Sequence, residues 1–217
     1  VVDYDPDITK LPLCLQSDGN NGRYITGGVL VAKHPELNLM NASFNRCQLV
    51  GPKKLRVRMM PPQHLGQFHA AAEQQGKPLE VAIVIGASPA VMYSAASKIP
   101  YTRDELEFAG ALGNETVDVV KCKTIDVMVP ANAEFVIEGH VLPDVREEEG
   151  PFGEFTDSYV PVMKNHVFEV TAVTHRKDAM WHDIFAGGQE DLKLLGLPIE
   201  SEVFNHIKRF TNPDNIL

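Results

Sequence analysis

The feature that most constrains the fold is the seven-residue run Leu79–Ile85, LEVAIVI, which is rich in β-branched residues and almost free of polar ones. A short apolar run of this composition predicts a strand buried inside a sheet, where both faces are covered. The chain must therefore supply a sheet around this segment and other elements to cover it.

Further segments follow the strand or helix pattern. Strands are predicted at residues 24–34, 43–50, 55–60, 116–121, 125–129, 134–142 and 166–175. Helices are predicted at residues 64–75, 89–98, 104–112, 189–195 and 199–210, the last two separated by Gly196 and Pro198. Strands and helices do not alternate regularly, as βαβ units would. We therefore predict a mixed α+β domain with a largely antiparallel sheet or barrel and helices packed outside.

Charge and cysteine content limit the classes of function. The 217-residue chain has a net charge of −9 and no basic block, so its surface should on average repel nucleic acid and anionic membranes. It contains no apolar run near the roughly 20 residues that span a bilayer, and no export signal is visible. Cys14, Cys47 and Cys122 are widely spaced, which argues against a disulfide framework or a Cys-only zinc site. We expect a cytoplasmic protein.

The segment at residues 146–155, REEEGPFGEF, places four carboxylates within eight residues. Glu149 and Glu154 are five residues apart, an offset that shares no face on a helix or a strand. Only a turn can aim both side chains into one cavity, and the intervening Gly-Pro-Phe-Gly supplies turn chemistry. Bringing two carboxylates together favours protonation of one of them, which creates a proton donor. The alternative is a solvated acidic loop.

A cation would lower the cost of gathering these carboxylates, and Arg46 is the candidate. It lies in the segment NASFNRCQ at residues 41–48. Asn41, Ser43 and Asn45 alternate along the chain, so we expect them to line one face of a strand, with Phe44 and Arg46 on the other. Arginine stays charged and binds carboxylates through two parallel hydrogen bonds. Taken alone, Arg46 is interpreted more readily as a surface arginine.

Taken together, these segments resemble the UbiD family of decarboxylases, which use prenylated FMN. The similarity runs from about residue 11 to residue 210, in the family's order and near its spacing. It is carried by TGGVLVAKHPE, NASFNRCQ, PPQH, LEVAIVIGASPA, DELEFAGAL, VPANAEFVIEGHVLP and, most specifically, EEEGPFGEF. Family members are around twice this length. The resemblance implies a split β-barrel, similar to that of flavin reductases, with packed helices.

The resemblance also implies a Glu–Arg–Glu catalytic set, which falls on Glu149, Arg46 and Glu154. The implied reaction is the reversible, non-oxidative decarboxylation of an aromatic, heteroaromatic or α,β-unsaturated carboxylic acid. Glu154 would protonate the carbon that loses the carboxyl group, while Arg46 and Glu149 position the substrate carboxylate. One departure from the family pattern is the Asn45 and Cys47 pair that flanks Arg46, which suggests altered pocket packing.

A divalent metal site beside the flavin phosphate is implied as well, with ligands at Asn41, His64 and Glu105. This oxygen-rich set suits Mn²⁺ or Mg²⁺ better than structural zinc. Each ligand has an alternative reading: Asn41 as a turn residue, His64 as a structural histidine at a helix start, and Glu105 as an acid favoured by the helix dipole. Glu107 competes with Glu105 for the role.

The remaining implied contacts surround the same ion. A K⁺ site falls near Ser97 and Glu105, and the flavin should meet Ser43, Phe44 and Gln63, together with Asn41 and His64. The implied partners are a small carboxylic acid, a flavin prenyltransferase that supplies the cofactor, and further copies of the chain in a homo-oligomer of the full-length protein.

Three hypotheses follow for the chain as a whole. It is a decarboxylase, an isolated flavin-binding or ligand-binding domain without turnover of its own, or a structural barrel with a solvated acidic loop. We predict that residues 1–217 form a single domain that binds prenylated FMN and is part of a longer chain. Residues 189–217 would then begin the connection to a C-terminal portion.

Overall fold

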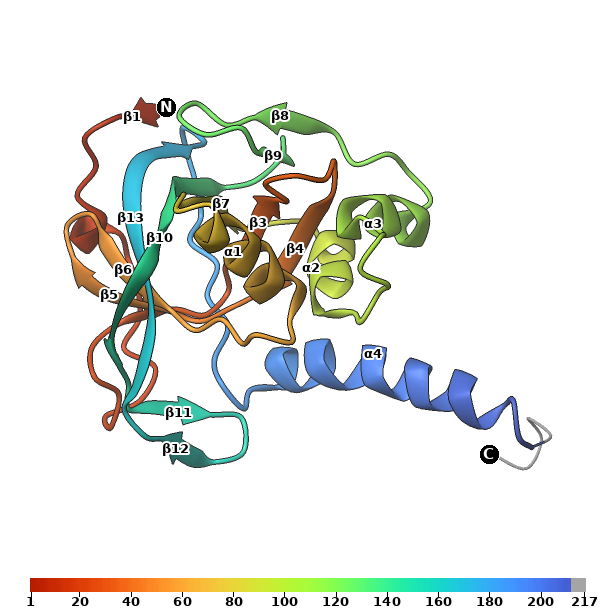
Figure 1. The fold of residues 1–217 in the computed structure, drawn as a ribbon. Helices are drawn as coiled ribbons and strands as arrows, with labels where there is room; N and C mark the ends of the chain where they lie inside the picture. Colours follow the sequence, from red (N-terminus) through yellow and green to blue (C-terminus); the bar gives the residue numbers. More distant parts are fainter. Residues whose placement is uncertain (212–217) are drawn as a thin grey trace.

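The computed structural model describes residues 1–211, and Figure 1 shows their arrangement. The main sheet of this region has the strand order β2-β5-β6-β13-β10-β7-β3-β4, with β1 paired to β13, and its ladders are antiparallel. Its strands are β1 Val2–Asp3, β2 Tyr24–Ile25, β3 Val29–Lys33, β4 Met40–Phe44, β5 Cys47–Gly51, β6 Lys54–Val57, β7 Leu79–Ile85, β10 Phe135–Glu149 and β13 Met163–His175. Two small hairpins join β8 Val119–Lys121 to β9 Met128–Pro130 and β11 Phe152–Glu154 to β12 Ser158–Val160.

Strand β7 confirms the prediction of a buried strand at Leu79–Ile85. It pairs with β10 on one edge and with β3 on the other. Leu79, Val81, Ile83 and Ile85 point into one hydrophobic cluster, whereas Ala82 and Val84 belong to a second cluster on the opposite face. Burial on both faces explains why this strand is apolar throughout instead of alternating.

The helices are α1 His64–Gln74, α2 Pro89–Ala96, α3 Glu105–Gly113 and α4 Gln189–Ile207, with a short 3₁₀ helix at Ile8–Lys10. Helix α1 buries Leu65, Phe68 and Ala72 in the larger cluster and ends just before the positive-φ residue Gly76, as predicted. Helices α2 and α3 pack together beside β4, and α4 extends away from the body (Figure 1).

Two predicted strands are interrupted in the structure. The segment 24–34 breaks between β2 and β3, and the segment 43–50 breaks between β4 and β5. The second break falls at Asn45 and Arg46, so strict alternation of faces does not extend to Arg46. In the other direction, β10 is longer than predicted and continues to Glu149 through a register shift between Val141 and Arg146.

The two helices predicted at the C-terminal end are a single helix, so the predicted break at Pro198 was wrong. Pro198 lies inside α4 and is its buried residue. A proline in a helix interior removes one backbone hydrogen bond, but packing on a neighbouring element offsets part of that loss. Helix α4 contacts α2, and Pro198 lines the cavity between these two helices. Residues 212–217, the end of the predicted connection, lie outside the described residues.

The prediction of an α+β domain with a largely antiparallel sheet is confirmed by these elements. The finer prediction of a split barrel stays a prediction, because within residues 1–211 no ladder joins β2 to β4 and closes the sheet. No helix in this range is long and apolar enough to cross a membrane.

Candidate functional site

Arg46 joins two glutamates that are more than 100 residues away in the chain. Its Nε donates to Oε1 of Glu149 at 3.0 Å and its Nη2 donates to Oε2 of the same carboxylate at 2.9 Å. Its Nη1 donates to Oε1 of Glu154. The guanidinium therefore binds one carboxylate through two bonds and a second one through its remaining edge, the geometry in which arginine–carboxylate pairs are strongest.

The two glutamates differ in exposure. The side chain of Glu149 is 0% exposed and that of Arg46 is 8% exposed, whereas 28% of the Glu154 side chain is accessible. Glu149 is thus a buried anion held by Arg46, and Glu154 faces the solvent-accessible side of the cluster. One guanidinium facing two carboxylates leaves the cluster with an excess of negative charge if both are ionised.

The turn between the glutamates comes from the Gly-Pro-Phe-Gly segment, as the sequence predicted. Strand β10 ends at Glu149, Gly150 adopts φ +100°, and β11 begins at Phe152. Only glycine tolerates this φ without strain. Asn20 and Asn21 hold the turn: the Asn21 Nδ2 donates to the carbonyl of Gly150 at 3.0 Å, and the amide of Gly153 donates to Oδ1 of Asn20 at 2.8 Å.

Two supporting side chains of the cluster were missed from the sequence. Asn165 on β13 donates from Nδ2 to Oε2 of Glu149 at 2.8 Å and is itself buried. The ring of Phe152 lies under Arg46, with its centroid 4.7 Å from Cζ. Phe152 is buried, whereas Phe155 of the same acidic segment is 47% exposed. No spacing signal in the sequence links Asn165 to Glu149.

A second polar cluster joins β4 to the start of α1 and α3. Asn41 donates from Nδ2 to Oε1 of Glu105 at 2.9 Å, and the amide of Ala42 donates to Oε2 of Glu105 at 2.9 Å. Nδ1 of His64 lies 3.8 Å from Oε1 of Glu105. The structure therefore brings together the three predicted metal ligands. The competing residue Glu107 is exposed on the same helix.

The electrostatics of this cluster fit a divalent cation. Glu105 is only 2% exposed, and burial raises the pKa of its carboxyl group to about 7, against the opposing hydrogen bonds from Ala42 and Asn41. Burial also lowers the pKa of His64, which favours a neutral imidazole with a free lone pair. Residues 1–211 contain no group of three His, Cys, Asp or Glu side chains placed to hold a metal, so a metal site here would need the amide oxygen of Asn41 as its third ligand.

A long groove runs between the two clusters. One cavity of about 540 Å³ is lined by Asn41, Ser43, His64, Ser97 and Glu105. A neighbouring cavity of about 520 Å³ is lined by Arg46 and Glu154. The two cavities share the lining residues Thr26, Phe44, Gln63, Ile184, Asp191 and Leu195. All predicted site residues except Glu149 therefore line one continuous groove, and Glu149 lies behind Arg46.

Thr26 and the residues from the C-terminal segment were not predicted as part of this groove. Asp183 accepts hydrogen bonds from the amide and the hydroxyl of Thr26 and so anchors that segment beside the groove. Asp191 and Leu195 reach it from α4. The sequence of residues 24–34 did not predict the contact between Thr26 and Asp183, because the two residues are far apart in the chain and meet only in the folded protein.

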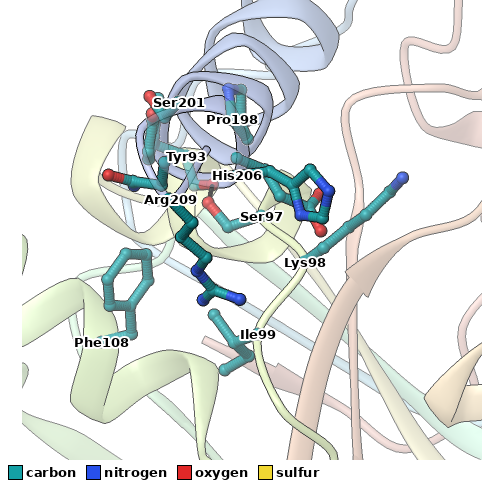
Figure 2. A pocket seen from close by; sticks show the side chains of 11 residues that line it. Tyr93, Ser97, Lys98, Ile99, Phe108, Pro198, Ser201, His206 and Arg209 are labelled. Atoms are coloured by element: carbon teal, nitrogen blue, oxygen red, sulfur yellow. Dashed lines mark hydrogen bonds between the residues drawn. The ribbon is translucent and has the colours of Figure 1, made fainter. Parts of the chain in front are cut away.

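A separate cavity of about 370 Å³ lies between α4 and α2. Figure 2 shows Arg209 reaching from the turn after α4 toward Phe108 and Ile99, with His206 and Lys98 on the other side of Ser97. Ser97 borders both this cavity and the groove, but neither glutamate of the Arg46 cluster lines it. We therefore assign the candidate site to the groove.

Comparison with known proteins gives a consistent picture. A family model described as the UbiD 3-octaprenyl-4-hydroxybenzoate carboxy-lyase Rift-related domain matches residues 1–189. An anhydromevalonate phosphate decarboxylase of Methanosarcina mazei is 35% identical over 217 residues, which is 100% of this chain and 50% of that protein.

Solved structures are similar over nearly the whole chain. The UbiD-class enzyme HmfF from Pelotomaculum thermopropionicum, in an evolved dimeric form with prFMN, has a TM-score of 0.94 and 41% identity, covering 96% of this chain and 49% of that one. The vanillic acid decarboxylase of Sedimentibacter hydroxybenzoicus in its closed form has a TM-score of 0.88 and 29% identity, covering 96% and 47%. The chain spans about half the length of these relatives.

Proposed function

The chain belongs to the UbiD family, and from that premise we propose that it carries the flavin-binding site of a reversible, non-oxidative decarboxylase. The proposed cofactor is prenylated FMN, which a UbiD-class relative contains. The proposed substrate is an aromatic, heteroaromatic or α,β-unsaturated carboxylic acid. The observation that carries the proposal is the contact of Arg46 with both Glu149 and Glu154 at one end of the groove.

The groove offers suitable residues for each part of the cofactor. Ser43, Phe44 and Gln63 would contact the flavin between the two clusters. Asn41, His64 and Glu105 would bind its phosphate through Mn²⁺ or Mg²⁺, with K⁺ near Ser97, and the buried Glu105 carboxyl group supports a cation there. When bound, the cofactor supplies an electron sink for the pair released as carbon dioxide leaves.

Arg46 would bind the substrate carboxylate through the edge of its guanidinium that contacts Glu154. Its bidentate bond to the buried Glu149 fixes the guanidinium plane, and Asn165 fixes Glu149 in turn. The Nη1 edge, which contacts Glu154, is the edge that faces the groove. A substrate carboxylate competes with ionised Glu154 for this edge, so substrate binding favours the protonated form of Glu154.

Glu154 is accordingly the proposed proton donor. It lines the groove and is partly accessible, whereas Glu149 is buried and does not line it. After carbon dioxide departs, the proton of Glu154 would pass to the carbon that held the carboxyl group. Ionised Glu154 would then pair again with Arg46, which restores the contact seen in the structure.

The test is Glu154→Gln, compared with Glu148→Gln, which alters an exposed glutamate of the same acidic segment. Both variants are produced together with a flavin prenyltransferase and Mn²⁺. We expect Glu154→Gln to retain the cofactor, measured by mass and visible spectrum, but to lose at least 100-fold in carbon dioxide release, since general acid–base catalysis contributes about that much. Normal turnover by Glu154→Gln would refute the assignment of the donor.

A second candidate is a flavin-binding domain without turnover of its own. It is favoured by the fact that the chain spans about half the length of its relatives. Bound prenylated FMN without carbon dioxide release from any acid tested would support it. We also propose that the full-length protein is a homo-oligomer; one UbiD-class relative is described as dimeric in an evolved form.

A further inference from the structure

Arg58 lines the same cavity as Arg46, but its guanidinium has no anionic partner in the described part of the chain. Its hydrogen-bond acceptors are the sulfur atoms of Met163 at 3.5 Å and Met60 at 3.9 Å. Thioether sulfur is a weak, uncharged acceptor. Arg46 in the same cavity is bound to two glutamates. Arg58 therefore has more unpaired charged donors for a ligand than Arg46 has.

The backbone places the two arginines side by side. Strands β5 and β6 are antiparallel with Cys47 opposite Val57, so the next pair in the ladder is Arg46 opposite Arg58. The amide of Arg58 donates to the carbonyl of Arg46 at 3.2 Å. Both side chains line the same cavity, and like charges at neighbouring positions repel. An anion bound between them would offset this repulsion.

The position of Arg58 is also fixed by a neighbour of the proposed catalytic cluster. Asn45 donates from Nδ2 to the backbone carbonyl of Arg58 at 2.9 Å. The other anionic residue on the cavity wall besides Glu154 is Asp191, which accepts a hydrogen bond from the amide of Gly187 at 2.8 Å. The remaining wall is largely apolar, with Met60, Phe155 and Ile184.

We propose that Arg58 binds a second anionic group of the substrate, distal to the carboxylate that is lost. This inference rests on the proposed function, because it names the substrate class of the same site: an unsaturated acid that carries a phosphate monoester or a second carboxylate. Arginine presents planar paired donors that suit both groups. The apolar wall contacts the carbon skeleton between the two anions.

The test uses three (E)-alk-2-enoic acids of matched length that end in a phosphate monoester, a carboxylate or a hydroxyl group. Their dissociation constants are measured by calorimetry on protein loaded with prenylated FMN and Mn²⁺, in the Glu154→Gln background to prevent turnover. Arg58→Gln is compared with Arg56→Gln, which removes a nearby arginine of β6 whose partner, Glu147, lies outside the cavity. Arg58→Lys tests partial rescue.

We expect an anionic probe to bind roughly tenfold to a hundredfold more tightly than the hydroxyl probe, the range for hydrogen bonds to charged groups. Arg58→Gln should abolish this preference and leave the affinity for the hydroxyl probe within about twofold, while Arg56→Gln keeps the preference. The more strongly preferred probe tells phosphate from carboxylate.

Equal affinity for all three probes, or an unchanged preference in Arg58→Gln, overturns the inference. Loss of prenylated FMN in Arg58→Gln with the preference intact also overturns it and assigns the residue to the cofactor. Turnover is measured separately in the wild-type chain. Arg58-dependent binding without carbon dioxide release supports the anion subsite and refutes the proposed decarboxylation, so the two failures are distinguishable.

Discussion

Replacing Arg46 by methionine should destabilise the fold strongly, because it strands a buried charge. Glu149 is 0% exposed, and its carboxylate accepts two hydrogen bonds from Arg46 and one from Asn165. In Arg46→Met only the neutral amide of Asn165 remains. Breaking a buried ion pair from one side costs about 3–5 kcal/mol of unfolding free energy.

A double variant distinguishes the cost of losing the ion pair from the cost of leaving one charge buried without a partner. In the double variant Arg46→Met/Glu149→Leu no ionised group is left buried, and a buried ion pair can be replaced by apolar residues with little net cost. The remaining loss comes from the unpaired amide of Asn165, about 1–3 kcal/mol. The double variant should therefore be more stable than Arg46→Met, although it carries one more substitution.

Urea unfolding followed by circular dichroism measures the free energies, and thermal unfolding gives an independent check. For a chain of this size, 3–5 kcal/mol corresponds to a fall in Tm of roughly 6–20 °C. The control is Arg56→Met, whose partner Glu147 has a side chain 29% exposed; exposed pairs are worth at most about 1 kcal/mol. The reasoning fails if Arg46→Met lowers the free energy of unfolding no more than this control does. It also fails if the losses of Arg46→Met and Glu149→Leu are additive in the double variant.

Two further predictions concern the metal ligands and acid stability. His64→Gln should lower the Mn²⁺ content after equilibrium dialysis at least tenfold, because it removes a proposed ligand. The control His140→Gln alters another half-buried histidine and should leave the Mn²⁺ content unchanged. Equal metal content in the two variants would exclude His64 as a metal ligand. His166 lies beside His69 and Arg146, and burial lowers the pKa of its imidazole to about 4. As the pH drops from 6.5 toward 4, the imidazole is protonated in the unfolded chain but not in the folded one. The free energy of unfolding therefore falls over this range, by at most about 3 kcal/mol. His166→Gln should flatten this dependence in urea titrations, and an unchanged slope would show that other groups, such as Glu73 or His69, control it.

Much of the local structure could be predicted from the sequence by short-range rules. The apolar run at Leu79–Ile85 predicted β7, and the helix that starts at His64 ended before Gly76 as expected. The turn chemistry at residues 150–153 predicted that Glu149 and Glu154 reach a common place. In each of these cases the interacting groups lie close together in the chain or share one repeating pattern.

Long-range contacts were not readable in the same way. Glu105 meets Asn41 across 64 residues, and only the resemblance to a known family suggested the pairing. Asn165 and Arg58 carried no signal, because their importance comes from the register of antiparallel strands, which depends on the whole sheet. Pro198 failed as a helix breaker because a local rule was overridden by packing of α4 on the body.

The groove is built from two kinds of wall, and this difference has an evolutionary consequence. Asn41 lies on β4 and Arg46 in the break between β4 and β5, both against the sheet, whereas Asp191 and Leu195 belong to α4, which extends away from the body (Figure 1). Substitutions along that helix can reshape the entrance without disturbing the anchored side. Variation in the sequence of α4 can therefore change the shape of the groove while the contacts of Arg46 and Asn41 are kept.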